Sequence, residues 1–488
     1  MGCRGIHRIS NTVILAVLLL VEAAAAINPA PDDNMLRIVY ASEILRDIEN
    51  GEPVNISSSM ISGNLNFGNL SLPSSSSNPS QISSSSLKFI NVPIQIVDSE
   101  IRGIVNFNSV FFSESCEFTG TIFREDAKFE DVIFVRPAKF RGAHFDKYAY
   151  FSNDKFIEGA DFGESQFSKT AHFSGTQFCN YAYFRDVLFN GDAQFSGTRF
   201  GGDAYFSNAK FDKECYFPGA KFDREVYFKE AQFNFANFEK GQFGEYVGFV
   251  KAKFYDDAYF REVQFGGLAD FSDTEFREDV YFENAKFDIA FDLSRSKFDR
   301  LYVFWDSIDS ALVYDGSTYL GLIKNFKNME RFNDADRCYY QYRKISQANK
   351  NFGWSKLEDI LAGSSCGYGV RPGYTLAWSI ACILSFGVII WAGNGLKIHS
   401  NYSYYKKYNT DFSHQNDYPS INNSQNEVSE ISLLDSIYYS ALVFFHTHLP
   451  SSWEPSKRWS LWLVLLEDII GWLLLALFLV ALANVIIR

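Results

Sequence analysis

The chain has few of the residues on which metal, redox and disulfide sites are built. Its 488 residues include 7 Cys, 7 His and 4 Met. The cysteines stand singly, with no CxxC pair and no metal-ligand spacing, so the sequence predicts no metal ligands and no disulfide framework. We interpret the cysteines as small buried residues: Cys3, Cys116, Cys179, Cys215, Cys338, Cys366 and Cys382.

Positive charge is also scarce. Lys and Arg number 45 against 58 Asp and Glu, for a formal net charge of -13. Binding to nucleic acid requires basic surface, so we expect no nucleic-acid partner. No acid pair, Ser-His-Asp arrangement or phosphate loop stands out from the background. The sequence therefore predicts no catalytic residues, no bound cofactor and no enzyme activity.

Long apolar runs are confined to the two ends of the chain. Arg4 and Arg8 precede an apolar run at 13–21 and an alanine-rich stretch, which is the layout of a secretory signal peptide over residues 1–26. An uncleaved anchor, or a shorter chain starting at Met35, are the alternatives. Residues 27–100 are expected to form an N-terminal cap with a Ser-rich surface loop.

The middle of the chain has a repeat of phenylalanine, of which the sequence holds 49. Between Phe107 and Phe298 the spacing alternates between five and six residues, and 35 of the 36 positions in this register are Phe, the other being Leu293. This period fits neither a helix nor a strand. One stretch of the expected repeat core reads Phe195, Phe200, Phe206, Phe211, Phe217, Phe222 and Phe228.

A fixed short period predicts a solenoid whose turns bury one face against their neighbours. Small residues such as Ala193 and Ala204 usually stand two positions before a Phe and should fill the space beside it. The segment at 101–300 resembles the pentapeptide-repeat family, which implies a right-handed quadrilateral β-helix and a mainly β fold. Four units per turn give about nine turns. The extra residue of alternate units departs from the family pattern and is expected to bulge two corners of each turn outward.

Residues 301–371 are expected to form a helical connector. Ser317 is a candidate cap for a first helix, with Tyr319, Leu322 and Phe326 at helical spacing, and Asn333 begins a second helix. A third, short helix over "NFGWSKLEDILAG" is typical of a helix on a membrane surface. A hairpin that caps the open end of the solenoid is an equally acceptable interpretation.

Residues 372–488 contain two segments long enough to cross a bilayer, one beginning at Pro372 and the other at Trp459. Between them, 432–445 predicts a helix of about three turns, too short to span. "LLDSIYYSALVFF" and "LLEDIIGWLLLALFLVALAN" resemble the pore helix and inner helix of the potassium-channel superfamily. The resemblance implies an α-helical two-span membrane domain like that of an ion channel, and a homotetramer if a pore is formed.

The filter of that superfamily is missing. The run after the short helix is "FFHTHLPSSW", which contains no glycine, whereas a Thr-x-Gly-Tyr-Gly run would be needed to turn carbonyls toward an ion. The Gly-Tyr-Gly at 367–369 precedes the first span and is interpreted as a turn. Candidate pore-loop residues are His446, Thr447, His448 and Leu449, and candidate carboxylates of the second span are Glu467 and Asp468.

Two readings of these candidates stay open at this point. The histidines either face a lumen or lie at the membrane interface. The two acids either lie inside a span, where a carboxylate is a functional candidate, or lie in the headgroup region ahead of a helix that starts at Ile469.

We therefore expect a multi-pass protein of the cell membrane, with the lipid bilayer and ions as partners. Its predicted function is ion transport through a channel-like domain joined to a pentapeptide-repeat domain. The alternative is a non-conducting cell-surface scaffold. If the signal peptide is real, the β-helix is extracytoplasmic and the loop between the spans faces the cytoplasm, opposite to the channel family. Basic residues near the loop, such as Lys397 and Lys457, agree with that orientation.

Overall fold

The computed structural model describes residues 36–70, 87–398, 431–450 and 453–486. The expected signal peptide at 1–26 and most of the Ser-rich loop lie outside the described residues. The chain divides into two units, Met1–Thr318 and Tyr319–Arg488, which are treated separately below.

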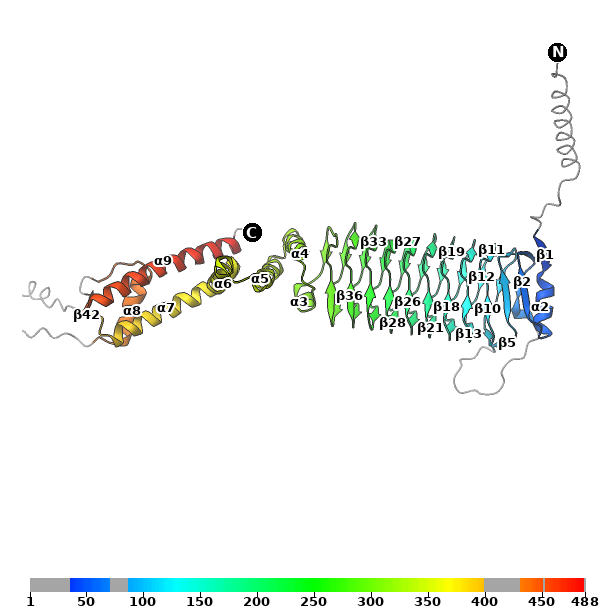
Figure 1. The fold of residues 1–488 in the computed structure, drawn as a ribbon, viewed down its shortest axis with the longest axis horizontal. Coiled ribbons are helices and arrows are strands. Elements are labelled where there is room, and N and C mark those ends of the chain that lie inside the picture. The colour runs from blue at the N-terminus through cyan, green and yellow to red at the C-terminus, as the bar shows by residue number, and fades with distance from the viewer. Residues whose placement is uncertain (1–35, 71–86, 399–430, 451–452, 487–488) are drawn as a thin grey trace, which may run out of the picture. The chain divides into compact units, whose positions relative to one another are not determined.

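The first unit is a β-solenoid (Figure 1). One turn consists of the two-residue strands β11 (Ile122–Phe123), β12 (Ala127–Lys128), β13 (Ile133–Phe134) and β14 (Ala138–Lys139). The next strand, β15 (His144–Phe145), pairs in parallel with β11, with Phe123 opposite Phe145. Its strands form sheets of 20, 11 and 10 strands, of which the largest folds over two sides. The mainly β solenoid predicted from the sequence is confirmed, with about eleven turns.

Phenylalanine rings fill the centre of the solenoid. Along one side, each ring stacks on the ring of the next turn: the centroids of Phe151 and Phe173 lie 5.1 Å apart at an interplanar angle of 4°. Between sides the rings meet edge to face, as Phe151 and Phe162 do at 82°. Both arrangements are favoured by the ring quadrupole. The predicted repeat core is buried, and so are the small residues Ala193 and Ala204 beside it.

The solenoid begins before the boundary at residue 101 that the Phe register suggested. Strand β1 (Arg37–Tyr40) pairs with β3 (Ser59–Ser62), and β2 (Val54–Ser57) pairs with β6 (Ile94–Val97), all in parallel. Aliphatic side chains such as Ile61 and Leu65 take the inward places in these turns. Because these residues do not repeat as Phe does, a count of Phe gives nine turns and misses the first ones. Helix α2 (Ala41–Glu49) follows β1 and buries Ile44 and Ile48.

Two corners of each turn depend on left-handed backbone. Asp131, Gly142 and Asn153 have φ of 61°, 65° and 60°, and such residues recur every eleven positions. The N–H of Ala143 donates to the Phe140 carbonyl across 2.9 Å and closes one of these turns. The six-residue units form bends instead.

One six-residue unit is shortened to five residues. Strands β27 (Lys210–Tyr216) and β30 (Gln232–Asn237) shift register at this place, between Phe211 and Glu214.

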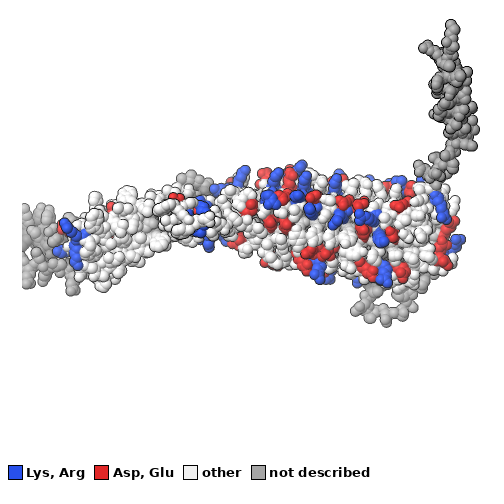
Figure 2. Space-filling view, in the orientation of Figure 1, with Lys and Arg blue, Asp and Glu red and all other residues white. Residues whose placement is uncertain are grey.

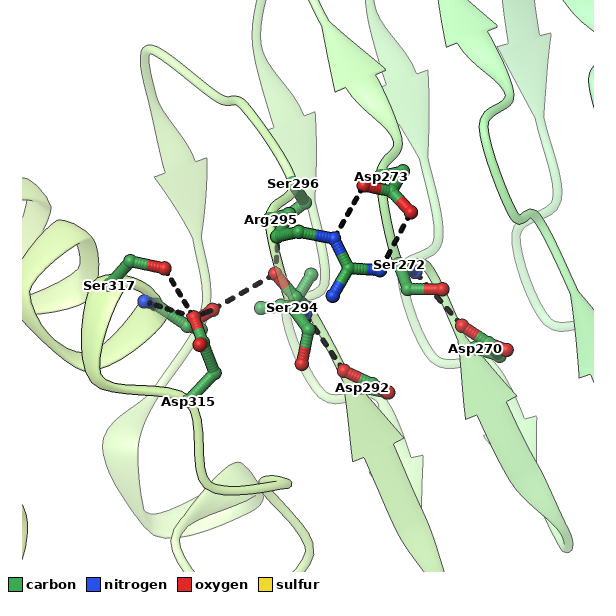
Figure 3. Close-up of polar contacts among 11 residues, drawn as sticks. Asp270, Ser272, Asp273, Asp292, Ser294, Arg295, Ser296, Asp315 and Ser317 are labelled. Carbon is green, nitrogen blue, oxygen red and sulfur yellow. Dashed lines mark hydrogen bonds and ion pairs between the residues drawn. The ribbon is translucent and has the colours of Figure 1, made fainter.

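The C-terminal end of the solenoid carries a group of Asp and Ser side chains (Figure 3). Asp270 and Asp292, one turn apart, accept bonds from the N–H groups of Ser272 and Ser294 at 2.9 and 2.8 Å. Beyond them, helix α3 (Trp305–Ile308) buries its Trp305 side chain. These turns and the helix close the last coils of the repeat.

Asp315 caps helix α4 (Gly316–Asn328), the role that the sequence assigned to Ser317. The Asp315 carboxylate accepts a bond from the N–H of Thr318 at 2.9 Å and another from the Ser317 hydroxyl (Figure 3). These bonds, that from Ser317 first, hold the pKa of Asp315 below its usual range. Asp accepts as well as Ser at an N-cap, and Asp315 stands two residues before Ser317, directly ahead of the first residue of α4.

The helical connector forms as the sequence predicts. Tyr319, Leu322 and Phe326 of α4 are fully buried, and α5 (Phe332–Asn349) and α6 (Trp354–Cys366) follow. Asp359 of α6 accepts a bond from Arg343 of α5 at 2.7 Å. The expected apolar side of α6 is exposed, with 82% of Trp354 accessible.

The Gly-Tyr-Gly tripeptide is the short helix η2 (Gly367–Gly369) between α6 and the next helix, α7 (Pro372–Ala392). All three residues have positive φ, and the Tyr368 ring lies over Gly363, where a Cβ atom would come within 2.9 Å of the ring. The Tyr368 hydroxyl donates to Gln347 of α5. The tripeptide is therefore a turn that ties α5 to the start of α7, as predicted.

One carboxyl group lies inside the solenoid. Asp154 is fully buried, its Oδ1 accepts a bond from the N–H of Val132 at 2.8 Å, and its Oδ2 has no partner among the described residues. Burial raises the pKa of Asp154 well above its usual value. At the equivalent place in later turns, Thr176 and Thr198 donate their hydroxyls to backbone carbonyls instead.

Phe184→Ala should destabilise the solenoid by about 3–5 kcal/mol, because it removes a ring that stacks on the turns before and after it. Urea unfolding of the full chain in detergent, followed by the β signal in circular dichroism, measures the change. Gln194→Ala is the control, since the Gln194 side chain lies outside the core. An equal loss for both variants would contradict the stacked core.

Asp154→Asn should stabilise the chain at neutral pH. The folded state keeps the proton on Asp154 while the unfolded state releases it above about pH 4, so the wild type loses stability as the pH rises from there toward the raised pKa. The amide keeps the acceptor for Val132 and carries no charge to bury. Thermal unfolding of both chains from pH 3 to pH 8 should show melting temperatures that agree at pH 3 and diverge above pH 4. A difference that stays constant with pH would contradict this assignment.

Candidate functional site

The second unit contains two helices long and apolar enough to cross a membrane, α7 (Pro372–Ala392) and α9 (Arg458–Ile486). Pro372 occupies the first turn of α7, where its missing N–H costs nothing. Figure 2 shows charged side chains over the β-solenoid and a largely uncharged surface on these helices. Their exposed side chains include Leu376 and Trp378 of α7 and Trp462 and Leu473 of α9.

Helix α9 begins earlier than one of the two sequence readings assumed. It starts at Arg458, not at Ile469, because the apolar run from Trp459 onward is already helical. Glu467 and Asp468 therefore lie in the interior of the helix. A helix start at Ile469 is therefore wrong, while the depth of the two acids in a membrane stays a prediction.

A third helix, α8 (Leu433–Phe444), lies against both long helices. The Ser432 hydroxyl accepts a bond from the N–H of Asp435 at 3.2 Å, while the Asp435 carboxylate accepts one from the N–H of Ser432 at 3.0 Å. This capping box fixes the start of the helix at the predicted place. With twelve residues, α8 is too short to cross a bilayer.

Two glycines let α8 approach its neighbours closely. A Cβ atom on Gly387 of α7 would stand 2.8 Å from the Cα of Ile437, and one on Gly471 of α9 would stand 2.5 Å from the Phe444 carbonyl oxygen. Small residues at such contacts are typical of helices packed in membranes. Gly471 therefore serves close packing of α8 against α9.

The close approach brings polar groups of the three helices together. The Ser440 hydroxyl of α8 lies 2.8 Å from the carbonyl oxygen of Ile383 in α7 and is hydrogen-bonded to the Glu467 carboxyl of α9. Ser440 and Glu467 are both fully buried. Ser436, one helical turn before Ser440, is fully buried as well. We call Ile383, Ser436, Ser440 and Glu467 the junction cluster.

Two oxygens of the junction cluster, Oγ of Ser436 and Oε2 of Glu467, have no hydrogen-bond partner among the described residues. Buried polar atoms are nearly always paired, so each exception calls for an explanation. The sequence identified Glu467 but not the two serines. The two serines stand four residues apart, on one face of a largely apolar helix, and this spacing could have identified them.

Asp468 lies next to the junction cluster and holds the first pore-loop candidate. The Nδ1 atom of His446 is 2.5 Å from Oδ1 of Asp468, and the His446 ring stacks on Trp472 with centroids 4.4 Å apart. The structure thus brings His446 and Asp468 together. It leaves Thr447, His448 and Leu449 exposed, with no contact among them that would mark a site.

A two-stranded antiparallel ribbon closes the loop side of the three helices. Strand β42 (Leu396–Ile398) follows α7, and β43 (Trp453–Pro455) precedes α9. The Trp453 ring stacks on Tyr439 of α8 at 5.9 Å, next to the buried Ile390 and Val443. This apolar contact fixes the position of α8 relative to the two long helices.

Within the described residues, no group of three or more His, Cys, Asp or Glu could hold a metal ion. The histidines His144 and His172 of the solenoid lie on its outer face, where His172 stacks on Tyr150 at 4.9 Å. The polar contacts of the solenoid surface include ion pairs between successive turns, such as Arg124 with Asp146 at 2.9 Å. Such exposed pairs contribute little to stability.

The comparisons with known proteins identify the solenoid. Residues 173–221 and 217–264 match the family described as pentapeptide repeats (9 copies). The pentapeptide-repeat prediction is confirmed for this part of the chain, whose turns have the four-sided geometry described above. Searches of curated proteins and of solved structures gave no match. The comparisons give no family support for the predicted likeness of 372–488 to potassium channels.

Gly471→Ala should destabilise the second unit by about 1–3 kcal/mol, because the added methyl group would meet the backbone of α8. Gly373→Ala is the matched control: it places the same methyl group on α7 in open space and should be neutral or slightly stabilising. Thermal unfolding in detergent, followed by tryptophan fluorescence, measures both. Equal melting temperatures for the two variants would contradict the packing described for α8.

Proposed function

We propose that the chain is a multi-pass membrane protein whose second unit conducts ions. In this proposal α7 and α9 cross the bilayer, and α8 enters it from the loop side without crossing. The lengths and apolar composition of α7 and α9 support the first part. Their exposed leucine and tryptophan side chains suit contact with lipid.

The observation that carries the proposal is the buried polar face of α8. A short helix that only anchored a loop would present apolar residues to its neighbours. Instead α8 buries Ser436 and Ser440, and the Ser440 hydroxyl is hydrogen-bonded to a buried carboxyl group on α9. Polar and ionisable groups inside a membrane domain are costly and usually belong to ion or proton pathways.

The proposed pore requires several copies of the chain around an axis, since each copy supplies a single re-entrant helix. Four copies are the number that the potassium-channel resemblance implies. The exposed apolar faces of α7 and α9 would then be divided between lipid and neighbouring copies. Because the run after α8 has no glycine, we do not assign it the backbone-carbonyl filter of that superfamily.

The β-solenoid is proposed as the extramembrane part, with no enzyme activity. Its surface carries charged and tyrosine side chains that suit water, and among its described residues Asp154 is the one buried carboxyl group. If residues 1–26 act as a signal peptide, this part lies outside the cytoplasm.

Proteoliposomes test the conduction proposal. Vesicles with the full chain should release trapped K⁺ or Cl⁻ faster than empty vesicles. Gly471→Ala should lose most of the leak, because it separates α8 from α9, whereas Gly373→Ala should retain it. The assay is repeated from pH 5 to pH 8, so that a pathway closed at one pH is not overlooked.

The absence of a leak over that whole range would overturn conduction and favour the alternative, a membrane-anchored scaffold. One observation favours this second function. His446, the first residue of the run where a filter would lie, is tied to Asp468 and stacked on Trp472. A scaffold would need only the anchoring by α7 and α9.

A further inference from the structure

The contacts of the Ser440 hydroxyl within the junction cluster lack either a hydrogen or a positive charge. The Ser440 hydroxyl has one proton but lies within hydrogen-bonding reach of two groups, the Ile383 carbonyl at 2.8 Å and the Glu467 carboxyl. If the hydroxyl donates its proton to the Ile383 carbonyl, the contact between Ser440 and Glu467 has no hydrogen unless Glu467 is protonated. If it donates to Glu467, the contact with Ile383 has no hydrogen between its two oxygens. A proton on Glu467, or a cation among the three oxygens, resolves the conflict.

We infer that the junction cluster binds one small alkali cation, Na⁺ or Li⁺, in competition with a proton. The inference rests on the proposal that α7 and α9 cross a bilayer, and it does not require that the protein conducts.

The available ligands are all hard oxygens, the type that alkali and alkaline-earth cations prefer. They are the carbonyl of Ile383 from α7, the hydroxyls of Ser436 and Ser440 from α8, and the carboxyl of Glu467 from α9. Two of these groups, Ser436 and Glu467, still have unpartnered oxygens although both side chains are fully buried. A cation would use those oxygens, whereas a proton on Glu467 alone leaves the Ser436 hydroxyl unexplained.

The titratable groups around Glu467 do not supply the missing charge. Cys382 of α7 and Tyr439 of α8 face it and are neutral in their ordinary forms. The neighbouring Asp468 is paired with His446 on another side of α9. Glu467 forms no ion pair with a Lys or Arg among the described residues. A buried carboxylate without a positively charged partner is costly, so a bound cation or proton is the stable state.

Chemical labelling of Glu467 tests the inference without any measurement of transport. Dicyclohexylcarbodiimide enters lipid and reacts with protonated carboxyl groups. The full chain in phosphatidylcholine vesicles is treated in choline chloride, NaCl or LiCl at equal ionic strength, and the labelled residue is identified by peptide mass. We expect Glu467 to be labelled in choline and protected by Na⁺ or Li⁺ in a saturable way. The Na⁺ concentration that protects half of the Glu467 should fall about tenfold for each unit by which the pH rises, because protons then compete less for the site.

Variants of the serines test the ligands. Ser440→Ala and Ser436→Ala should leave labelling in choline intact and weaken the protection by Na⁺, whereas Ser440→Thr, which keeps the hydroxyl, should retain it. Glu454→Gln is a control for non-specific labelling, because Glu454 is exposed on β43. Labelling in choline also shows that each variant still buries Glu467.

Labelling at the same rate in all three salts would overturn the inference, since Glu467 would then bind a proton only. No labelling of Glu467 even at pH 5 would overturn it too, because a site that competes with protons must hold a protonated fraction there. Vesicles that do not leak but show protection by Na⁺ would reject conduction and leave the cation site in place. Vesicles that leak but show no protection by Na⁺ would support conduction and reject the cation site.

Discussion

The solenoid depends on the agreement between two distances. Successive strands of a parallel ladder lie about 4.8 Å apart, and aromatic rings stack at nearly the same separation. A turn of 22 residues places each Phe directly over the Phe of the next turn, as with Phe162 and Phe184 at 5.1 Å. Backbone hydrogen bonds and ring stacking therefore reinforce one another along every side. A turn of any other length must be compensated locally, as the shortened unit near Phe233 is by a register shift confined to one corner.

The second unit depends on a different kind of fit. Here two glycines remove the side chains that would otherwise keep α8 away from α7 and α9. Once the backbones are in contact, a serine can reach a carbonyl on one neighbour and a carboxyl on the other. Burial makes such polar contacts strong where they are satisfied and costly where they are not.

Much of the fold could be predicted from the sequence, because the Phe register is long and regular. Prediction failed for residues that follow no regular spacing, because only their contacts in the folded chain show their role. The first turns use Ile, Val and Leu, which have no distinctive spacing. The sequence therefore placed the start of the solenoid at residue 101, although it begins at Arg37. The sequence indicated Ser317 as the cap of α4, whereas Asp315, two residues earlier, accepts the capping bond from the N–H of Thr318.

The candidate site was predicted only in part. Glu467 was identified from its charge in an apolar segment, and α8 from its length. Ser436 and Ser440 were missed, because serine is common on helix surfaces and only the packing of α8 shows that they face inward. The bond between His446 and Asp468 joins residues 22 positions apart, which no local pattern indicates.

The ladder hydrogen bonds of the solenoid all connect one turn to the next, as the N–H of Phe173 does with the Gln194 carbonyl at 2.7 Å. A mechanical load along the solenoid axis therefore acts on these bonds directly and in series. Under such tension the turns would separate one at a time, each exposing its few phenylalanines to water, and not all together. The repeat would extend in steps of one coil, each able to close again on the rings of the turn beneath it.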